Sequence, residues 1–257
     1  MVEGRLSGVV LAGGTGSRLY PLTKVTNKHL LPVGGYPMIY YPIAKLVAAG
    51  ITDVLVVTGL EHMGDVVNLL GSGRDWGARF TYRVQDEPGG IAQALALAEA
   101  FAGGGSTVVL LGDNIFEADI TPFVDGFRAQ PAGARLLLKS VNDPQRFGVA
   151  EVRDGRIVGI EEKPARPRSD LCVTGIYMYD ARVFEFIRDL QPSARGELEI
   201  SDVNNRYIAE ESLHYDILPG WWTDAGTIAS LQLANRLALE LPAGGMPAGR
   251  TPAGVRA

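Results

Sequence analysis

Cysteine is almost absent from this chain, which has one thiol, Cys172, among its 257 residues. One thiol cannot form an intramolecular disulfide, and no Cys/His spacing typical of a metal site surrounds it, so we expect a small buried residue in a strand. The three histidines, His29, His62 and His214, lie in unrelated contexts. These absences argue against a disulfide scaffold, a zinc site and a Ser/His/Asp hydrolase.

Long apolar runs and an excess of positive charge are also missing. No apolar run approaches the ~20 residues of a membrane span, and the net charge of −5 is opposite to what a broad nucleic-acid surface needs. The first residues, MVEGRLSGVVLAGG, lack the charged, apolar and small-residue succession of a secretory signal. We therefore expect a cytoplasmic protein whose partners include neither membrane nor nucleic acid. An anionic ligand would have to be bound by a few placed cations.

Apolar runs and helical patterns alternate in the first half of the chain. Several apolar runs, VVLA, VLVV and VVLL among them, lack polar alternation, which is typical of strands covered on both faces. The predicted strands lie at 8–12, 53–59, 79–84 and 107–113, and the predicted helices at 37–50, 62–71 and 90–103. This order predicts right-handed crossovers and a Rossmann-like, three-layer α/β sandwich with a mostly parallel central sheet.

From residue 133 the pattern becomes strand-rich. Asp154-Gly155 stands between two apolar runs and is a strong hairpin signal. Helical patterns return at 181–190, 199–211 and 227–240. The last stretch, 241–257, is rich in Pro, Gly and Ala without apolar periodicity, and predicts a disordered tail.

The stretch LAGGTGSRLYP, residues 11–21, combines three glycines with the end of a predicted strand. Without Cβ atoms the backbone can approach a ligand closely and direct several N–H groups at it, and phosphate is the usual ligand. The stretch is neither GxxxxGK[ST] nor a clean GxGxxG, because residue 19 is Leu. Taken alone, a tight structural turn explains the glycines about as well.

Two cations follow the glycines closely. Arg18 lies within a few residues of them, and Lys28 lies ten further on, in KHLLP. An arginine fork and a mobile lysine charge together neutralise a triphosphate effectively. In a chain of net charge −5, this local clustering favours a phosphate site.

LAGGTGSRLYPLT together with NKHLLPV resembles the signature of the sugar-1-phosphate nucleotidylyltransferases. The family's other motifs follow in order: PMIYYPI, VQDEPGGIAQAL, LLGDNIF, FGVAE, EEKP, VTGIYMYD, SARGELEISDVN and WWTDAGT. The likeness runs from about Gly8 to Glu240. It is greatest to the short, thymidylyl-transferring branch, which includes nucleotidyltransferases of spore-coat polysaccharide synthesis.

The resemblance implies thymidylyl transfer from dTTP to glucose 1-phosphate with Mg²⁺, giving dTDP-glucose and pyrophosphate. Such a reaction depends on positioning and charge neutralisation and needs no nucleophilic side chain. The resemblance further implies one catalytic domain over 1–240, with a nucleotide-binding part at 1–140 and a sugar-binding part at 141–240, and a homo-oligomer. Uridylyl transfer on the same scaffold and a non-catalytic nucleotide-sugar sensor are the alternatives.

The resemblance also assigns roles to individual residues. The phosphate-binding catalytic residues are Arg18, Lys28, Lys163 and Arg195. The nucleotide-binding residues are Leu11, Ala12, Gly13, Gly14, Gly16, Gln85, Gly90 and Asp113. The sugar-binding residues are Gly148, Glu162, Lys163, Val173, Tyr177 and Trp222, and the Mg²⁺ ligands are Asp113 and Asp224.

Without the family, several of these residues have simpler interpretations. Asp113 follows a strand, where parallel sheets bind ligands, but it would serve equally as a turn cap. The Glu162-Lys163 pair could be a solvated strand end, Arg195 a surface residue before a helix, and Trp222 ordinary core.

Two features depart from the family's pattern. Position 29 is His where many members have Gln, so no role is transferred to His29. Longer relatives continue with C-terminal helices that help form a regulatory nucleotide site, whereas a Pro/Gly-rich stretch follows Glu240 here. We expect that feedback site to be missing or rebuilt; inhibition by the thymidine diphosphate sugar that is strong and non-competitive with dTTP would contradict this.

Overall fold

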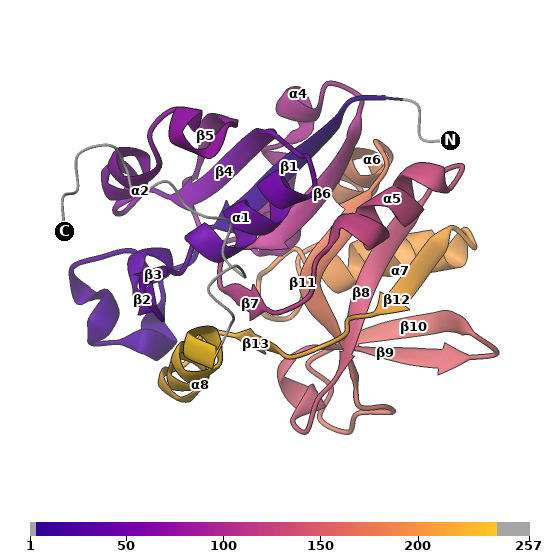
Figure 1. Ribbon diagram of the computed structural model, residues 1–257. Helices are drawn as coiled ribbons and strands as arrows, with labels where there is room; N and C mark the ends of the chain where they lie inside the picture. The colour runs from indigo at the N-terminus through magenta and orange to yellow at the C-terminus, as the bar shows by residue number, and fades with distance from the viewer. Residues whose placement is uncertain (1–3, 241–257) are drawn as a thin grey trace.

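The computed structural model describes residues 4–240 and is built on a nine-stranded sheet (Figure 1). Four of its strands lie side by side and parallel in the order β6, β1, β4, β5. They are β1 (Leu6–Ala12), β4 (Asp53–Gly59), β5 (Arg79–Gln85) and β6 (Ser106–Leu111). β5 ends the sheet and is half exposed, whereas the other three are almost entirely buried. The mostly parallel central sheet predicted from the sequence is confirmed.

Beyond β6 the same sheet continues with antiparallel strands. β11 (Leu171–Tyr179) pairs with β6 and then with both β8 (Ala134–Ser140) and β9 (Gly148–Arg153). β10 (Arg156–Glu162) pairs with β9, and β12 (Leu213–Ile217) runs parallel to β8. The strand-rich second half is therefore a continuation of the central sheet.

Helices cover both faces of the sheet, as Figure 1 shows. One layer consists of α1 (Tyr40–Ala48), α2 (Met63–Leu70) and α5 (Thr121–Ala129). The other consists of α3 (Ile91–Ala96), α4 (Glu99–Ala102), α6 (Val183–Arg188) and α7 (Ile200–Ala209). Along β1, Val10 packs toward the first layer and Val9 toward the second, because successive side chains of a strand point to opposite faces. Each such burial stabilises the fold by about 1.5–3 kcal/mol.

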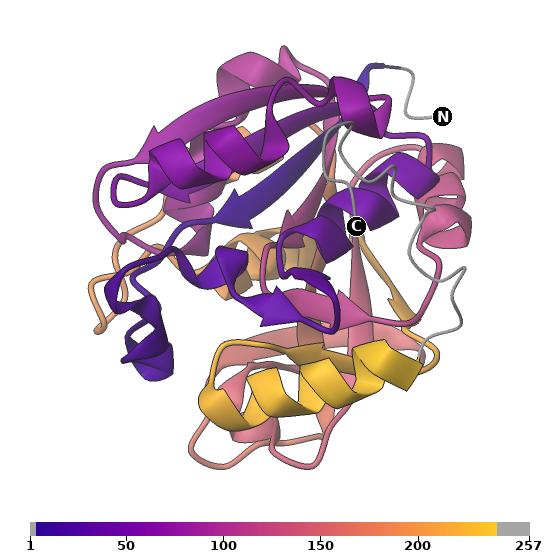
Figure 2. The same cartoon turned by 60° about the vertical axis from the view of Figure 1, so that its left-hand side comes forward.

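A third apolar cluster lies outside the three layers and supports the end of the described chain. α8 (Ile228–Glu240), the yellow helix in Figure 2, packs on this cluster. It contacts β2 (Pro32–Val33), which pairs with β3 (Tyr36–Pro37). Leu231 is buried there with Met38. The position of α8 brings the preceding segment, which contains β13 (Trp222–Asp224), beside the chain that follows β6.

That segment forms a small second sheet. β13 (Trp222–Asp224) pairs antiparallel with β7 (Asn114–Phe116), so that Asp224 lies opposite Asn114. The backbone N–H of Ala225 also donates to the carbonyl oxygen of Asp113 at 2.8 Å. Two segments far apart in the sequence are thereby fixed beside each other.

Local signals in the sequence agree with the structure in most places. Asp154 and Gly155 both have positive φ, at 50° and 73°, in the turn between β9 and β10, as the hairpin signal predicted. The helix expected at 90–103 is divided into α3 and α4. Short 3₁₀ turns occupy Ser17–Leu19, Leu22–Lys24, Lys28–Leu30, Arg74–Trp76 and Pro144–Arg146. No helix between residues 4 and 240 is long and apolar enough to cross a bilayer, and the tail predicted at 241–257 lies outside the described residues.

Candidate active site

A cleft of about 290 Å³ opens at the carboxyl ends of β1, β5 and β6. This is where open parallel sheets bind ligands, and residues of both halves of the chain meet there. The residues that the sequence singled out and that line the cleft are Leu11, Gly13, Gly14, Arg18, Lys28, Gln85, Gly90, Asp113, Gly148, Glu162, Lys163, Val173, Tyr177, Trp222 and Asp224.

The glycine-rich loop is shaped by close approaches to neighbouring side chains. A Cβ on Gly13 would lie 2.5 Å from Gln85 Oε1, and a Cβ on Gly16, whose φ is +62°, would lie 2.8 Å from Thr23 Cγ2. Gly16 supports the loop but does not line the cleft. Ala12 does not line it either, because its side chain is buried in the core toward α1. For these two residues the structure shows no direct access to a ligand.

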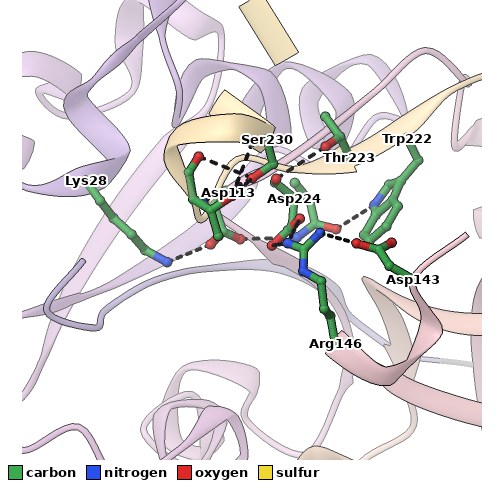
Figure 3. Close-up of polar contacts among 10 residues, drawn as sticks. Lys28, Asp113, Asp143, Arg146, Trp222, Thr223, Asp224 and Ser230 are labelled. Carbon is green, nitrogen blue, oxygen red and sulfur yellow. Dashed lines mark hydrogen bonds and ion pairs between the residues drawn. The ribbon is translucent and has the colours of Figure 1, made fainter. Parts of the chain in front are cut away.

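Two carboxylates face one small space at the centre of the cleft (Figure 3). Asp113 follows β6 and accepts a hydrogen bond from Lys28 Nζ at 2.6 Å. Asp224 ends β13. A Cβ built on Gly226 would lie 3.2 Å from Asp224 Oδ2, 3.6 Å from Asp113 Oδ2 and 3.1 Å from Arg18 Nη2. The pair of aspartates and the two cations predicted from the sequence therefore converge on one point.

The two carboxylates differ in their electrostatic surroundings. Burial opposes ionisation of Asp113, but the charge and hydrogen bond of Lys28 hold its pKa well below the usual range. Burial raises the pKa of Asp224 to about 6, and the negative charge of Asp113 adds to the rise although Arg146 and Arg18 oppose it. Asp113 is therefore ionised at neutral pH. An additional cation near Asp224 would lower the pKa of Asp224 and stabilise its ionised form.

The carboxylate pair fits a magnesium ion. Mg²⁺ binds oxygen ligands and typically takes one or two carboxylates together with substrate phosphates and water. Within residues 4–240 no group of three or more His, Cys, Asp or Glu could hold a metal by itself, so these two aspartates would need phosphate to complete the coordination. The absent side chain of Gly226 leaves the space between them open.

The side-chain amide of Gln85 is fixed at the end of β5. Its Nε2 donates to Gln93 Oε1 at 2.8 Å and to the carbonyl oxygen of Gly90 at 3.3 Å. Gln93 Oε1 also accepts from the N–H of Gly89 at 3.0 Å. Gln93 was not predicted from the sequence, because a Gln three residues after a glycine N-cap does not form the Ser/Thr-x-x-Glu/Gln capping box. Gln93 holds the Gln85 amide in one orientation.

The strand-rich half supplies a polar wall. Glu162, at the end of β10, accepts from Ser201 Oγ at 2.6 Å. A Cβ on Gly148 would lie 2.9 Å from that Ser201 oxygen and 3.2 Å from Glu162 Oε2, so any side chain there would displace this hydrogen-bonded pair. Lys163 has a φ of +45°, which a non-glycine residue adopts at a cost of about 1–3 kcal/mol and mostly at functional sites. Its N–H donates to Phe147 O at 2.9 Å.

Two aromatic residues complete this wall. Tyr177 is almost fully buried and stacks on Tyr179 at 5.9 Å between ring centroids. Burial, with the charge of Glu162, raises the pKa of Tyr177, so its hydroxyl stays protonated and can donate. Trp222 donates from Nε1 to Asn114 Oδ1 at 2.7 Å. Asn114 also accepts from Gly175 N at 3.0 Å and donates to Asp113 at 3.2 Å, a positioning function that the sequence did not indicate.

Arg195 is the predicted catalytic residue that does not line the cleft. Its guanidinium binds both oxygens of Glu199, with Nη2 at 2.8 and 2.7 Å, and lies 3.3 Å from Glu197 and 3.6 Å from Glu162. Its side chain is 39% exposed. Arg195 is therefore found where the simpler interpretation placed it, in a surface loop before a helix. To bind a phosphate in the cleft, its side chain would have to leave Glu199 and adopt another rotamer.

His29 lines the cleft but is buried, with 1% of its surface exposed. Its Nδ1 lies 2.8 Å from Asn27 Oδ1. Burial and the charge of Lys28 lower its pKa from 6.5 to about 3. The imidazole is therefore neutral across the physiological range.

The buried His29 makes stability depend on pH in a defined direction. Between pH 6.5 and about 3 the unfolded chain binds the additional proton, so stability falls as pH falls. Lowering the pH from 7.5 to 5.5 should cost the wild type about 1.4 kcal/mol more than it costs His29→Gln. Urea unfolding at both pH values measures the difference. His214→Gln, at an exposed position, should behave as the wild type; equal losses in wild type and His29→Gln would contradict the prediction.

Comparison with known proteins identifies relatives along nearly the whole described chain. A family model described as nucleotidyl transferase matches residues 7–240. A glucose-1-phosphate thymidylyltransferase of Neisseria meningitidis is 48% identical over 89% of this chain and 81% of its own length. One of Xanthomonas campestris is 44% identical over 88% of this chain and 78% of its own length.

Solved structures extend the comparison to the fold. A crystal structure from Bacillus anthracis, provisionally described as a glucose-1-phosphate thymidylyltransferase in complex with a sucrose, has a TM-score of 0.90 and 60% identity, covering 93% of this chain and 98% of that one. A UDP-glucose pyrophosphorylase in complex with UDP-glucose has a TM-score of 0.79 at 22% identity, covering 91% and 98%. The second likeness is one of fold alone.

Proposed function

The chain belongs to the nucleotidyl transferase family, and we propose that it transfers a thymidylyl group from dTTP to glucose 1-phosphate, giving dTDP-glucose and pyrophosphate. The observation that carries this proposal is the convergence of Asp113, Asp224, Lys28 and Arg18 on one point of the cleft. The glycine-rich loop and Gln85 flank this point on one side, and the polar wall around Glu162 flanks it on the other.

The reaction joins two anions. A phosphate oxygen of the sugar attacks the α-phosphorus of the nucleotide, the bond to the β-phosphate oxygen breaks, and pyrophosphate leaves on the opposite side. Mutual repulsion of the reactants is the main obstacle, so fixed cations aimed at the phosphates supply most of the catalysis. Arg18 and Lys28 supply that charge on the nucleotide side, and Lys163 supplies it on the sugar side.

The two aspartates are the residues that would hold Mg²⁺. When bound, the ion neutralises phosphate charge and stabilises the charge that develops on the leaving pyrophosphate. The Lys28–Asp113 pair keeps one of these carboxylates in its ionised form.

The remaining lining residues match the two substrates. Both N–H groups of the Gln85 amide donate to Gln93 and Gly90, so the amide presents its Oε1 as a fixed acceptor for an N–H at the edge of a pyrimidine. Glu162 and the protonated hydroxyl of Tyr177 offer an acceptor and a donor for sugar hydroxyls. The thymine methyl contributes on the order of 1 kcal/mol in a fitted pocket, so UTP should be a poorer but detectable substrate.

A matrix of nucleotides against sugar 1-phosphates, read by pyrophosphate release, tests the proposal. We expect the highest kcat/KM with dTTP and glucose 1-phosphate, and loss of release when EDTA removes Mg²⁺. A higher kcat/KM with UTP than with dTTP would replace the proposal by uridylyl transfer. Binding of dTDP-glucose without pyrophosphate release from any pair would indicate a sensor.

A further inference from the structure

Arg146 lines the cleft, and no sequence motif indicated a function for it. It ends the 3₁₀ turn Pro144–Arg146, before β9. Its Nη2 donates to both oxygens of Asp224, at 2.9 and 3.1 Å, and its Nη1 donates to Asp143 at 2.7 Å. Figure 3 shows Lys28 and Arg146 approaching the carboxylate pair from different sides. Each of the two aspartates that would hold a metal is thus in an ion pair.

These two ion pairs place one positive charge on each carboxylate. Lys28 pairs with Asp113, and Arg146, which also pairs with Asp143, pairs with Asp224, with lysine and arginine side chains that are 15% and 32% exposed. A divalent cation between the carboxylates would compete with both partners, because a guanidinium and a metal on the same carboxylate repel each other. A metal held by these carboxylates would therefore weaken their ion pairs with Lys28 and Arg146.

A released Arg146 would not move far. Its guanidinium carbon lies 4.9 Å above the ring centroid of Phe147, and the hydrogen bond to Asp143 is independent of Asp224. Phe147 is in turn packed against Trp222 at 5.3 Å. Both contacts keep the guanidinium at the cleft wall, where its planar fork matches two phosphate oxygens.

We propose that Arg146 is a further phosphate-binding residue, which is paired with Asp224 in the free protein and passes to a substrate phosphate when a divalent cation takes that carboxylate. The parallel with Lys28 supports this, because Lys28 faces the same cleft and is also paired with one of the two aspartates. The inference rests on the proposed function for the identity of the phosphate, but its central step is an exchange of ions on Asp224.

Arg146→Gln separates this role from a structural one. Without the competing guanidinium, the substrate-free protein should bind Mn²⁺ about fivefold more tightly, measured by the electron paramagnetic resonance signal of free Mn²⁺. At the same time kcat/KM for pyrophosphate release should fall by about a hundredfold, the usual scale for losing one charged donor to a transition state. Arg146→Lys should fall between Arg146→Gln and the wild type in both measurements.

The opposite direction of the two changes is decisive. If Arg146 merely positioned Asp224, both Mn²⁺ affinity and turnover would fall, and the proposal would be wrong. If Arg146 were only a counter-ion, Mn²⁺ affinity would rise with turnover unchanged, which would equally refute it. Arg153→Gln, at an exposed arginine of β9 paired with Glu151, is the matched control and should change neither quantity. Circular dichroism confirms that each variant is folded.

Failure of the proposed function is distinguishable from failure of this inference. If the wild type released no pyrophosphate from any substrate pair, calorimetric titration with magnesium tripolyphosphate would replace the kinetic measurement. The wild type should then bind this probe about tenfold more tightly than Arg146→Gln does. Equal affinities would overturn the role of Arg146 in binding phosphate.

Discussion

Lys28→Ala is expected to lower nucleotidyl transfer by about a thousandfold at saturating substrates, and Arg18→Ala by a similar factor. Lys28 Nζ lies 2.6 Å from Asp113, and Arg18 reaches the same space from the glycine-rich loop. Each substitution removes a fixed positive charge from the place where two anionic reactants must meet. Pyrophosphate release measured against both substrates would show the loss in kcat.

The Lys28 substitution should also affect stability, because it leaves Asp113 buried without its partner. Removing one member of a buried ion pair costs about 3–5 kcal/mol, and added Mg²⁺ should restore part of this. Denaturant unfolding with and without Mg²⁺ measures both effects. Lys24→Ala changes an exposed lysine of the same segment and should leave rate and stability near wild type. Near-normal rates in both Lys28→Ala and Arg18→Ala would refute the proposed charge neutralisation.

Gly226→Ala should lower turnover by about a hundredfold although it adds only one methyl group. The new Cβ would lie 3.1 Å from Arg18 Nη2 and 3.2 Å from Asp224 Oδ2, in the space that the carboxylates leave open. At these distances the Arg18 and Asp224 side chains must each shift by a few tenths of an ångström. Such shifts should lower the rate, because the reaction depends on the exact placement of these charged groups. Mn²⁺ affinity should fall together with the rate.

A matched glycine distinguishes this local effect from a general one. Gly64 lies in α2, where an added Cβ meets nothing within 4 Å. Gly64→Ala should therefore keep full activity and gain up to about 1 kcal/mol of stability from better helix propensity. Unchanged Mn²⁺ binding in Gly226→Ala would show that the space between the aspartates is not a metal site.

The parallel half of the fold was predictable because its signals are local. The apolar run at 53–59 coincides with β4, because burial on both faces of a strand requires consecutive apolar residues. The amphipathic pattern at 199–211 contains α7, because burial on one face of a helix imposes a period on the sequence. β7 and β13, three residues each, are too short to show any period. Their pairing depends on contacts between distant segments, which no local pattern records.

The candidate site was predictable to the extent that its residues occupy motifs or strand ends. Asp113 follows a buried strand, and a strand end alone marked it as a candidate ligand, whereas its pairing with Asp224 rested on the family resemblance. Arg146, Gln93 and Asn114 were not predicted, because what places each of them at the site is a contact with another site residue and not a local sequence pattern. Such contacts become visible only when the chain is folded.

The pairing of β7 with β13 has a consequence for the newly made protein. Asp113 belongs to the first half of the chain, but its counterpart Asp224 is translated only after β12, close to the last described helix. A nascent polypeptide that has already assembled its parallel strands still lacks one of the two aspartates that we propose as metal ligands. Catalytic competence should thus begin only after the ribosome has released the segment that carries β13.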